Sequence, residues 1–194
     1  QLNKIVGPET FNGSVLLLPK NCRLTEFTLE GISNIQGAFK CENYFYVNSF
    51  IMPFVNVAGD VTIALNTGSV DTGVEIEFPT LQEIGGTLTL ENNTNANNIT
   101  FPSLKKILGS CSVTTDFLKN DIEFTSLESI GTDGANTQIE FKIDVTNILC
   151  PKLKTINGLF NIVTSTVVWG MTADEVSYPT CLLYTSPSPR DAHE

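Results

Sequence analysis

Histidine is almost absent from this sequence of 194 residues: the only one, His193, is next to the last residue. Residues 1–180 therefore contain neither a Ser–His–Asp nor a Cys–His catalytic set, and no histidine that could bind zinc. The same stretch has no Cys-x-x-Cys pair and no glycine-rich phosphate-binding loop. We therefore expect no enzyme activity, no cofactor and no metal site.

Charged residues are also scarce, at 16% of the chain, and they leave a formal net charge of −10. This excess of acidic residues argues against nucleic acid and anionic lipid as partners. Although 41% of the residues are hydrophobic, no apolar run approaches the ~20 residues of a membrane-spanning helix. The composition is typical of one globular domain with a sizeable core. We expect such a domain to meet a membrane only through an anchor outside these residues.

A repeat with the template I-x-F-P-x-L-x-x-I-x-G-x-L-x-I runs through most of the chain. Three close copies begin at Ile76, Ile99 and Ile122. Looser copies extend the repeat in both directions, and a first copy would start at Leu2, with Ile5 and Gly7. The anchor residues are then spaced by 30, 22, 27, 23, 23 and 26 residues, and a period in this range indicates a solenoid. The anchors are Leu2, Ile32, Phe54, Leu81, Leu104, Leu127 and Leu153.

The pattern within each copy indicates the type of solenoid. Short stretches such as Ile76-x-Phe78 and Leu88-x-Leu90 alternate with period two, as strands with one buried face do. Proline follows phenylalanine in two copies and would end the strand there, while the repeat glycine permits a positive φ or a close backbone approach. We predict an all-β fold, a right-handed parallel β-helix and leucine-rich solenoid, with about seven irregular coils of 22–30 residues. An antiparallel sandwich, the main alternative, does not account for the recurrence of one template.

The C-terminal residues differ from the rest. Residues 181–191 resemble one reading frame of a transposase-based sequencing adapter. Residues 176–180 copy residues 76–80, but Cys181 then stands where the template requires leucine. We therefore expect a single native domain over residues 1–180, truncated at both ends, and residues 181–194 that are not native.

The F-P-x-L-x-x-I-x-G-x-L-x-I phrase resembles the receptor L-domain family. That family includes the ligand-binding L domains of insulin-type and epidermal-growth-factor-type receptors, and fungal glycolipid-anchored proteins of cell-wall organisation and sporulation. The resemblance covers residues 1–180 and is clearest over residues 51–163. It implies a leucine-rich right-handed β-helix in a cell-surface setting. An insertion over residues 131–138 departs from the family pattern.

Three glycosylation sequons support a secreted protein, at Asn12, Asn92 and Asn98. Outside the adapter-like residues the chain has four cysteines. We expect a disulfide between Cys22 and Cys41, which would join neighbouring coils. For Cys111 and Cys150 a second bridge and two buried thiols both remain open.

Two polar arrays suggest other functions. Glu75 and Glu77 flank Ile76, and Asp121 and Glu123 flank Ile122, so both pairs are expected on one outer face. That face is either solvated or a calcium or catalytic carboxylate site. Thr87-x-Thr89, Ser110-x-Ser112 and Asp60-x-Thr62 would form a hydroxyl array like that of ice-binding β-helices, interrupted by Gln138-x-Glu140.

The function that these observations favour is non-enzymatic recognition, adhesion or cell-wall organisation by an extracellular protein of the cell surface or cell wall. Its partner would be a protein or glycan ligand. The alternatives are the ligand-binding ectodomain of a signalling receptor and, in other classes, a β-helical polysaccharide-active enzyme or an ice-binding protein. The sequence assigns no binding residues.

Overall fold

The structure is a computed structural model that describes residues 4–17, 22–23, 26–42, 45–46, 49–64, 74–93, 96–115, 122–132, 137–143 and 148–163. All regular secondary structure in these ranges is β-strand. Three parallel sheets of seven strands account for most of it, and a small sheet of two strands, β4 (Cys22–Arg23) and β8 (Phe45–Tyr46), completes it. The adapter-like residues 181–194 lie outside the described residues.

Each coil of the chain contributes one strand to each large sheet. Sheet 1 contains β1 (Lys4–Val6), β5 (Glu26–Glu30), β9 (Ser49–Ile51), β12 (Val74–Glu77), β15 (Ala96–Thr100), β18 (Ile122–Glu123) and β21 (Ile148–Leu149). Sheet 2 contains β2 (Thr10–Phe11), β6 (Asn34–Ile35), β10 (Asn56–Val57), β13 (Glu83–Ile84), β16 (Lys106–Ile107), β19 (Ser129–Ile130) and β22 (Thr155–Ile156). Sheet 3 contains β3 (Val15–Leu17), β7 (Phe39–Glu42), β11 (Val61–Ala64), β14 (Leu88–Glu91), β17 (Cys111–Thr115), β20 (Gln138–Ile143) and β23 (Leu159–Val163).

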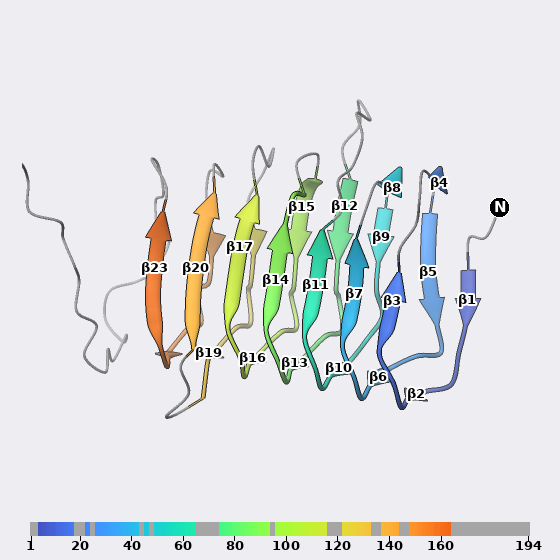
Figure 1. Cartoon of the computed structure of the whole chain (residues 1–194), viewed down its shortest axis with the longest axis horizontal. Coiled ribbons are helices and arrows are strands. Elements are labelled where there is room, and N and C mark those ends of the chain that lie inside the picture. The colour runs from blue at the N-terminus through green and yellow to red at the C-terminus, as the bar shows by residue number, and fades with distance from the viewer. Residues whose placement is uncertain are drawn as a thin grey trace, which may run out of the picture.

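The coils stack into a prism whose axis is horizontal in Figure 1. The chain runs down through sheet 1 at the back, passes through sheet 2 at the bottom and rises through sheet 3 at the front. It advances from right to left as it does so, which is the sense of a right-handed helix. The structure therefore confirms the predicted fold class, an all-β parallel β-helix.

Like residues stack on like residues inside the prism, because strands in successive coils are held in parallel register. Sheet 2 is the simplest case, since its short strands each turn one side chain inward. Backbone pairing aligns these side chains in one column from coil to coil. The column consists of Phe11, Ile35, Val57, Ile84, Ile107, Ile130 and Ile156.

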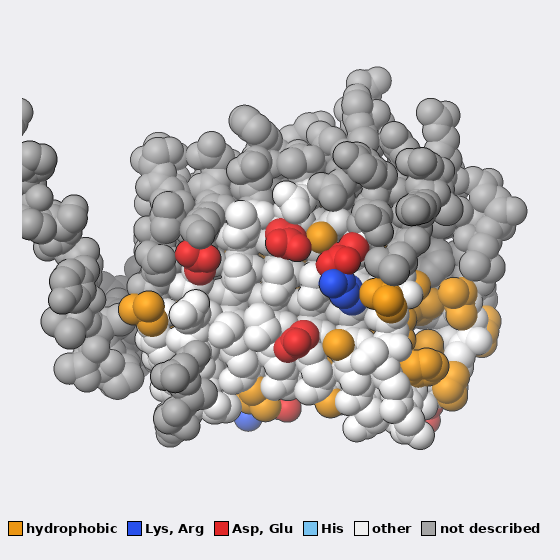
Figure 2. Space-filling model, viewed as in Figure 1, with side chains coloured by type: hydrophobic (Ala, Val, Ile, Leu, Met, Phe, Trp, Pro, Cys, Tyr) orange, Lys and Arg blue, Asp and Glu red, His pale blue; other side chains and the backbone are white. Residues whose placement is uncertain are grey.

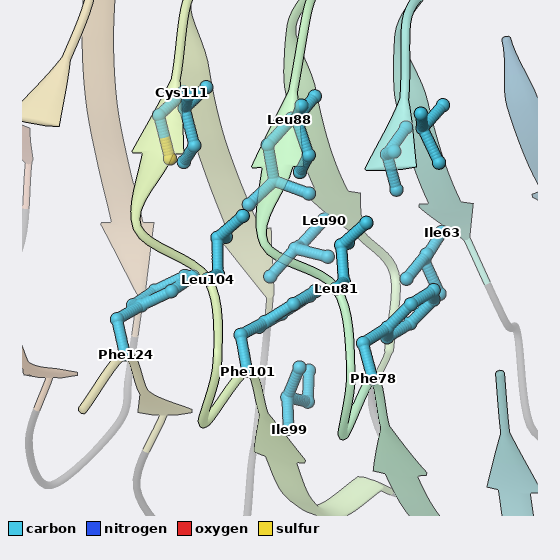
Figure 3. Close-up of a cluster of buried hydrophobic side chains, with 14 of the residues drawn as sticks. Ile63, Phe78, Leu81, Leu88, Leu90, Ile99, Phe101, Leu104, Cys111 and Phe124 are labelled. Carbon is cyan, nitrogen blue, oxygen red and sulfur yellow. The ribbon is translucent and has the colours of Figure 1, made fainter. Parts of the chain in front are cut away.

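The template leucines and phenylalanines form further columns of the core (Figure 3). Leu81, Leu104 and Leu127 are fully buried and occupy equivalent positions in successive coils, as predicted. The rings of Phe78 and Phe101 stack at 5.1 Å between centroids, and those of Phe101 and Phe124 at 5.2 Å. Stacked rings at this distance add about 0.5–1.5 kcal/mol to the free energy from burial itself.

Four of the repeat glycines allow a close backbone approach and do not have a positive φ, whereas Gly158 in the last copy has a φ of 150°. The amide of Gly59 donates to the carbonyl of Gly37 at 2.9 Å, and the amide of Gly86 donates to Gly59 at 3.0 Å. A Cβ added to Gly86 would lie 2.8 Å from the carbonyl carbon of Gly59, and one added to Gly109 would lie 2.6 Å from that of Gly86. We call Gly37, Gly59, Gly86 and Gly109 the glycine ladder.

The first coil starts later than the repeat predicts. Phe11 pairs with Ile35, and Val15 pairs with Phe39, so Phe11 holds the position given to Ile5 in the template alignment. Ile5 instead pairs with Leu29 on sheet 1. The predicted first copy was therefore misplaced by six residues, and Pro8 occupies the anchor position in place of Leu2. The first anchor spacing becomes 24 residues, closer to the others.

Candidate functional site

The outer face of sheet 3 presents a row of hydroxyl side chains in parallel register. Thr62 pairs with Thr89, and Thr89 pairs with Ser112. All three side chains are partly exposed, and neighbouring strands hold them ~4.8 Å apart. No hydrogen bond to another described residue occupies these three hydroxyls. They are therefore available to a partner, and we call Thr62, Thr89 and Ser112 the hydroxyl row.

A second polar row precedes the strands of sheet 3, but its polar groups hold the coils together. The Oδ1 atom of Asp60 accepts the backbone N–H of Thr87 at 2.7 Å. In the same way, Ser110 Oγ accepts the N–H of Gln138 at 3.0 Å, and Ser14 Oγ accepts the N–H of Ala38 at 2.9 Å. The sequence analysis missed this role of Asp60, Ser110 and Ser14. The signal that could have found it is a polar residue directly after the repeat glycine.

Charged residues border the hydroxyl row. The Nζ atom of Lys40 lies 2.7 Å from Oε1 of Glu42 on β7, and Lys40 pairs in register with Thr62. At the other end, Ser112 pairs with Glu140. Figure 2 shows this face as a largely uncharged surface with acidic side chains spaced around it. The predicted hydroxyl array is thus present over three coils and ends at a charged residue on each side.

The carboxylates predicted on one outer face lie on sheet 1. Glu77 and Glu123 share one row, with Thr100 between them. Glu75 accepts hydrogen bonds from the side-chain amides of Asn97, at 3.2 Å, and Asn98, at 2.9 Å. Asp121 lies outside the described residues. Over the residues that are described, no three His, Cys, Asp or Glu side chains gather into a group that could hold a metal ion.

The three sequons lie in different surroundings. Asn12 is exposed in the turn after β2, and Asn92 is exposed directly after β14 with a φ of 55°. Asn98 lies within β15, is only partly exposed and donates its side-chain N–H to Glu75. The side chains of Asn12 and Asn92 are thus open to a glycan, whereas a glycan on Asn98 would remove its hydrogen bond.

The structure does not contain the predicted disulfide between Cys22 and Cys41. Cys41 is a free, fully buried thiol that points into the core between Leu17 and Ile63. Cys22 lies on β4, which pairs with β8 and not with the strand of Cys41. The structure therefore leaves Cys41 unbridged and places the two cysteines on strands that do not pair with each other.

Cys111 and Cys150 are also free and buried, which resolves the two possibilities left open for them in favour of thiols. Cys111 holds the position of Leu88, and Cys150 follows Phe124 in the phenylalanine column. Burial raises the pKa of Cys150 to about 12 and raises the pKa of Cys111 further, with Cys150 adding a smaller contribution. The pKa of Cys41 is raised to about 12 by burial, with a smaller contribution from Glu42. Such thiols act as apolar core residues and not as nucleophiles.

Comparison with known proteins adds no family assignment. No helix among the described residues is long and apolar enough to cross a membrane. No protein-family model, no curated protein and no solved structure matches the chain.

Proposed function

We propose that this chain is a non-enzymatic recognition domain of the receptor L-domain type, acting outside the cell at the cell surface or in the cell wall. Its partner is a protein or glycan ligand that lies on the outer face of sheet 3. The resemblance of the repeat to receptor L domains motivates the compartment and the class. The single observation that supports the binding face is the hydroxyl row, whose hydroxyls form no hydrogen bonds within the described part of the chain.

A rigid scaffold suits this role. The strands that carry the hydroxyl row are the central strands of sheet 3, and their inward neighbours Val61, Leu88 and Cys111 are fully buried. Side chains on such strands keep their spacing, so a partner loses little free energy to reordering of the surface on binding.

A variant in the centre of the hydroxyl row tests the binding face. Thr89→Arg should abolish binding to cell-surface or cell-wall preparations without lowering the urea midpoint of unfolding, because the side chain points outward. Gln36→Arg, an exposed position outside sheet 3, is the matched control and should bind as the unmodified chain does. Unchanged binding by Thr89→Arg, or equal loss in both variants, would contradict the proposal.

Secretion and glycosylation test the compartment. When the chain is expressed in eukaryotic cells with a secretion signal, glycosidase treatment should lower its mass. Asn12→Gln and Asn92→Gln should each remove part of that shift, because both side chains are exposed. A secreted protein whose mass glycosidase leaves unchanged would count against an extracellular protein.

The hydroxyl row also bears on the ice-binding alternative. Ice binding by a β-helix relies on a broad flat array, whereas this row ends at Lys40 on one side and Glu140 on the other. We therefore favour recognition of a protein or glycan. A measured thermal hysteresis that Thr89→Arg removes would favour the ice-binding alternative instead.

A further inference from the structure

Positive charge gathers on one strip of the surface, away from the hydroxyl row. Five basic residues have described side chains: Lys40 on sheet 3, and four exposed lysines beside sheet 2. Lys40 is paired with Glu42. None of the other four forms an ion pair with a described residue. We call Lys105, Lys106, Lys152 and Lys154 the lysine strip.

Stacking of three successive coils assembles the lysine strip. The N–H of Glu128 donates to the carbonyl of Lys105 at 2.8 Å, and the N–H of Lys154 donates to that of Glu128 at 2.9 Å. Lys105, Glu128 and Lys154 are therefore successive members of one row, and Lys105 and Lys154 lie ~10 Å apart along the axis. Lys106 lies in the adjacent row between its register partners Glu83 and Ser129, and Thr155 follows Ser129 in that row.

The strip is locally positive although the whole chain carries a net charge of −10. Among the described residues next to the strip, only Glu83 and Glu128 are acidic, against four lysines. The other described carboxylates include those on the outer faces of sheets 1 and 3. At physiological ionic strength the Debye length is about 8 Å, so charges on the other faces are largely screened from a partner on this one.

The chemistry around the lysine strip favours a polysaccharide over a protein or a nucleic acid. Protein interfaces depend on large apolar or aromatic anchors, and single-stranded nucleic acids stack their bases on aromatic rings. Besides Glu83 and Glu128, the residues near the lysines include hydroxyls and prolines: Ser103, Ser129, Thr155, Pro102 and Pro151. Hydroxyls and mobile lysine charges suit a linear polymer that carries both hydroxyl and anionic groups.

We propose that the lysine strip binds an acidic polysaccharide, one bearing carboxylate or sulfate groups, laid along the axis of the β-helix. This site is separate from the hydroxyl row on sheet 3 and does not depend on ligand binding there. Its affinity comes from charge contacts, so it weakens as ionic strength rises.

Binding of defined polymers tests the lysine strip. Dextran sulfate and polygalacturonate represent the two kinds of anionic group, and uncharged dextran is the negative probe. We expect at least one charged polymer to bind and uncharged dextran not to bind. Binding by dextran sulfate alone assigns sulfate esters, and binding by polygalacturonate alone assigns carboxylates. The combined variant K105Q/K106Q/K152Q/K154Q should bind at least ~10-fold more weakly, since each exposed charge contact contributes a few tenths of a kcal/mol or more.

A control variant separates local charge from net charge. T10E/Q36E/A58E/Q138E changes four exposed residues elsewhere and reaches the same net charge as the lysine variant. The proposal requires it to bind much more tightly than the lysine variant, with both variants matching the unmodified chain in circular dichroism and urea midpoint. Equal weakening in the two variants, no binding to either polymer, or tighter binding to single-stranded DNA or polyglutamate would overturn it.

Discussion

At the scale of single residues, the glycine ladder sets the distance between coils. Each of its glycines brings its own backbone against the backbone of the preceding coil, where a Cβ would lie within 3.0 Å of main-chain atoms. Main-chain atoms in a stacked parallel ladder have little freedom to move aside. A side chain at these positions therefore forces neighbouring coils apart.

Gly86→Ala should destabilise the protein by ~2–3 kcal/mol, the range of overpacking in a closely packed interior. The added Cβ would lie 2.8 Å from both the Gly59 carbonyl carbon and the Asp60 nitrogen. Urea unfolding followed by circular dichroism measures the change. Gly13→Ala is the control, because its Cβ would lie 3.4 Å from the Phe11 ring, an ordinary contact. A loss for Gly86→Ala no larger than that for Gly13→Ala would contradict the role of the ladder.

The buried thiols should make stability fall with rising pH above about 9. The pKa of Cys41 and Cys150 is raised to about 12 in the folded chain, so between about pH 9 and 12 the unfolded chain releases thiol protons that the folded chain retains. Each thiol then costs about 1.4 kcal/mol of stability between pH 8 and pH 10. Below pH 9 both states keep the proton and this contribution to stability is fully present.

Cys111→Val isolates the thiol contribution from other groups that titrate in the same range. The variant places an apolar side chain between Leu88 and Ile139, and it should lose about 1.4 kcal/mol less than the unmodified chain between pH 8 and pH 10. Urea unfolding under reducing conditions at the two pH values gives the difference. Identical pH slopes would show that Cys111 ionises as readily in the folded chain as in the unfolded one.

At the scale of the strand and its turn, stability comes from columns that run across coils. The phenylalanine column is the clearest, because Phe101 packs between Phe78 and Phe124 with interplanar angles of 14° and 9°. Hydroxyls at the same turn connect the coils as well: Ser103 Oγ donates to the Pro79 carbonyl at 2.6 Å. Each turn thus combines a buried ring with a hydrogen bond to its neighbour.

Phe101→Ala should cost ~3–5 kcal/mol, the usual loss for a fully buried phenylalanine. The ring touches rings on both sides, so its removal leaves a cavity that neither neighbouring coil can fill. Phe11→Ala provides the comparison, because Phe11 is only partly buried in the first coil, and its loss should be less than half as large. Equal losses in thermal or urea unfolding would mean that the column gives no more stability than a partly buried ring.

At the scale of the whole molecule, the first coil differs from the central ones. Its inward side chains Ile5, Phe11, Val15 and Leu17 are partly exposed, whereas those of the central coils are fully buried. In a solenoid each coil contacts only its neighbours, so stability varies along the axis with the number of neighbours that cover a coil.

Hydrogen exchange should therefore be fastest in the first described coil. The amide of Gly7, which donates to Glu30, should exchange at least ~100-fold faster than the amide of Gly86, because opening the first coil exposes less apolar surface. Mass spectrometry after pulse labelling would resolve the two regions through their peptides. Uniform protection from β1 to β17 would indicate a single cooperative unit with no weaker end.

The sequence alone determined the coil, because the alternation of apolar and polar residues decides locally which side chains turn inward. From that pattern came the parallel β-helix, the column of Leu81, Leu104 and Leu127, and the in-register hydroxyls of Thr62, Thr89 and Ser112. The misplaced first copy shows the limit of the pattern, since a proline at the anchor position hid the true start.

Only the tertiary structure decided which residues become neighbours across coils. Lys105 and Lys154 share one strip because successive coils stack with Glu128 between them. Cys41 is unbridged, and Cys22 lies on a strand that pairs with β8 and not with the strand of Cys41. Asn98 is likewise held by Glu75 of the preceding coil. The physical reason is that inward or outward orientation follows from the chain's own period, whereas contacts between coils depend on loop lengths and inter-coil register, which no local pattern specifies.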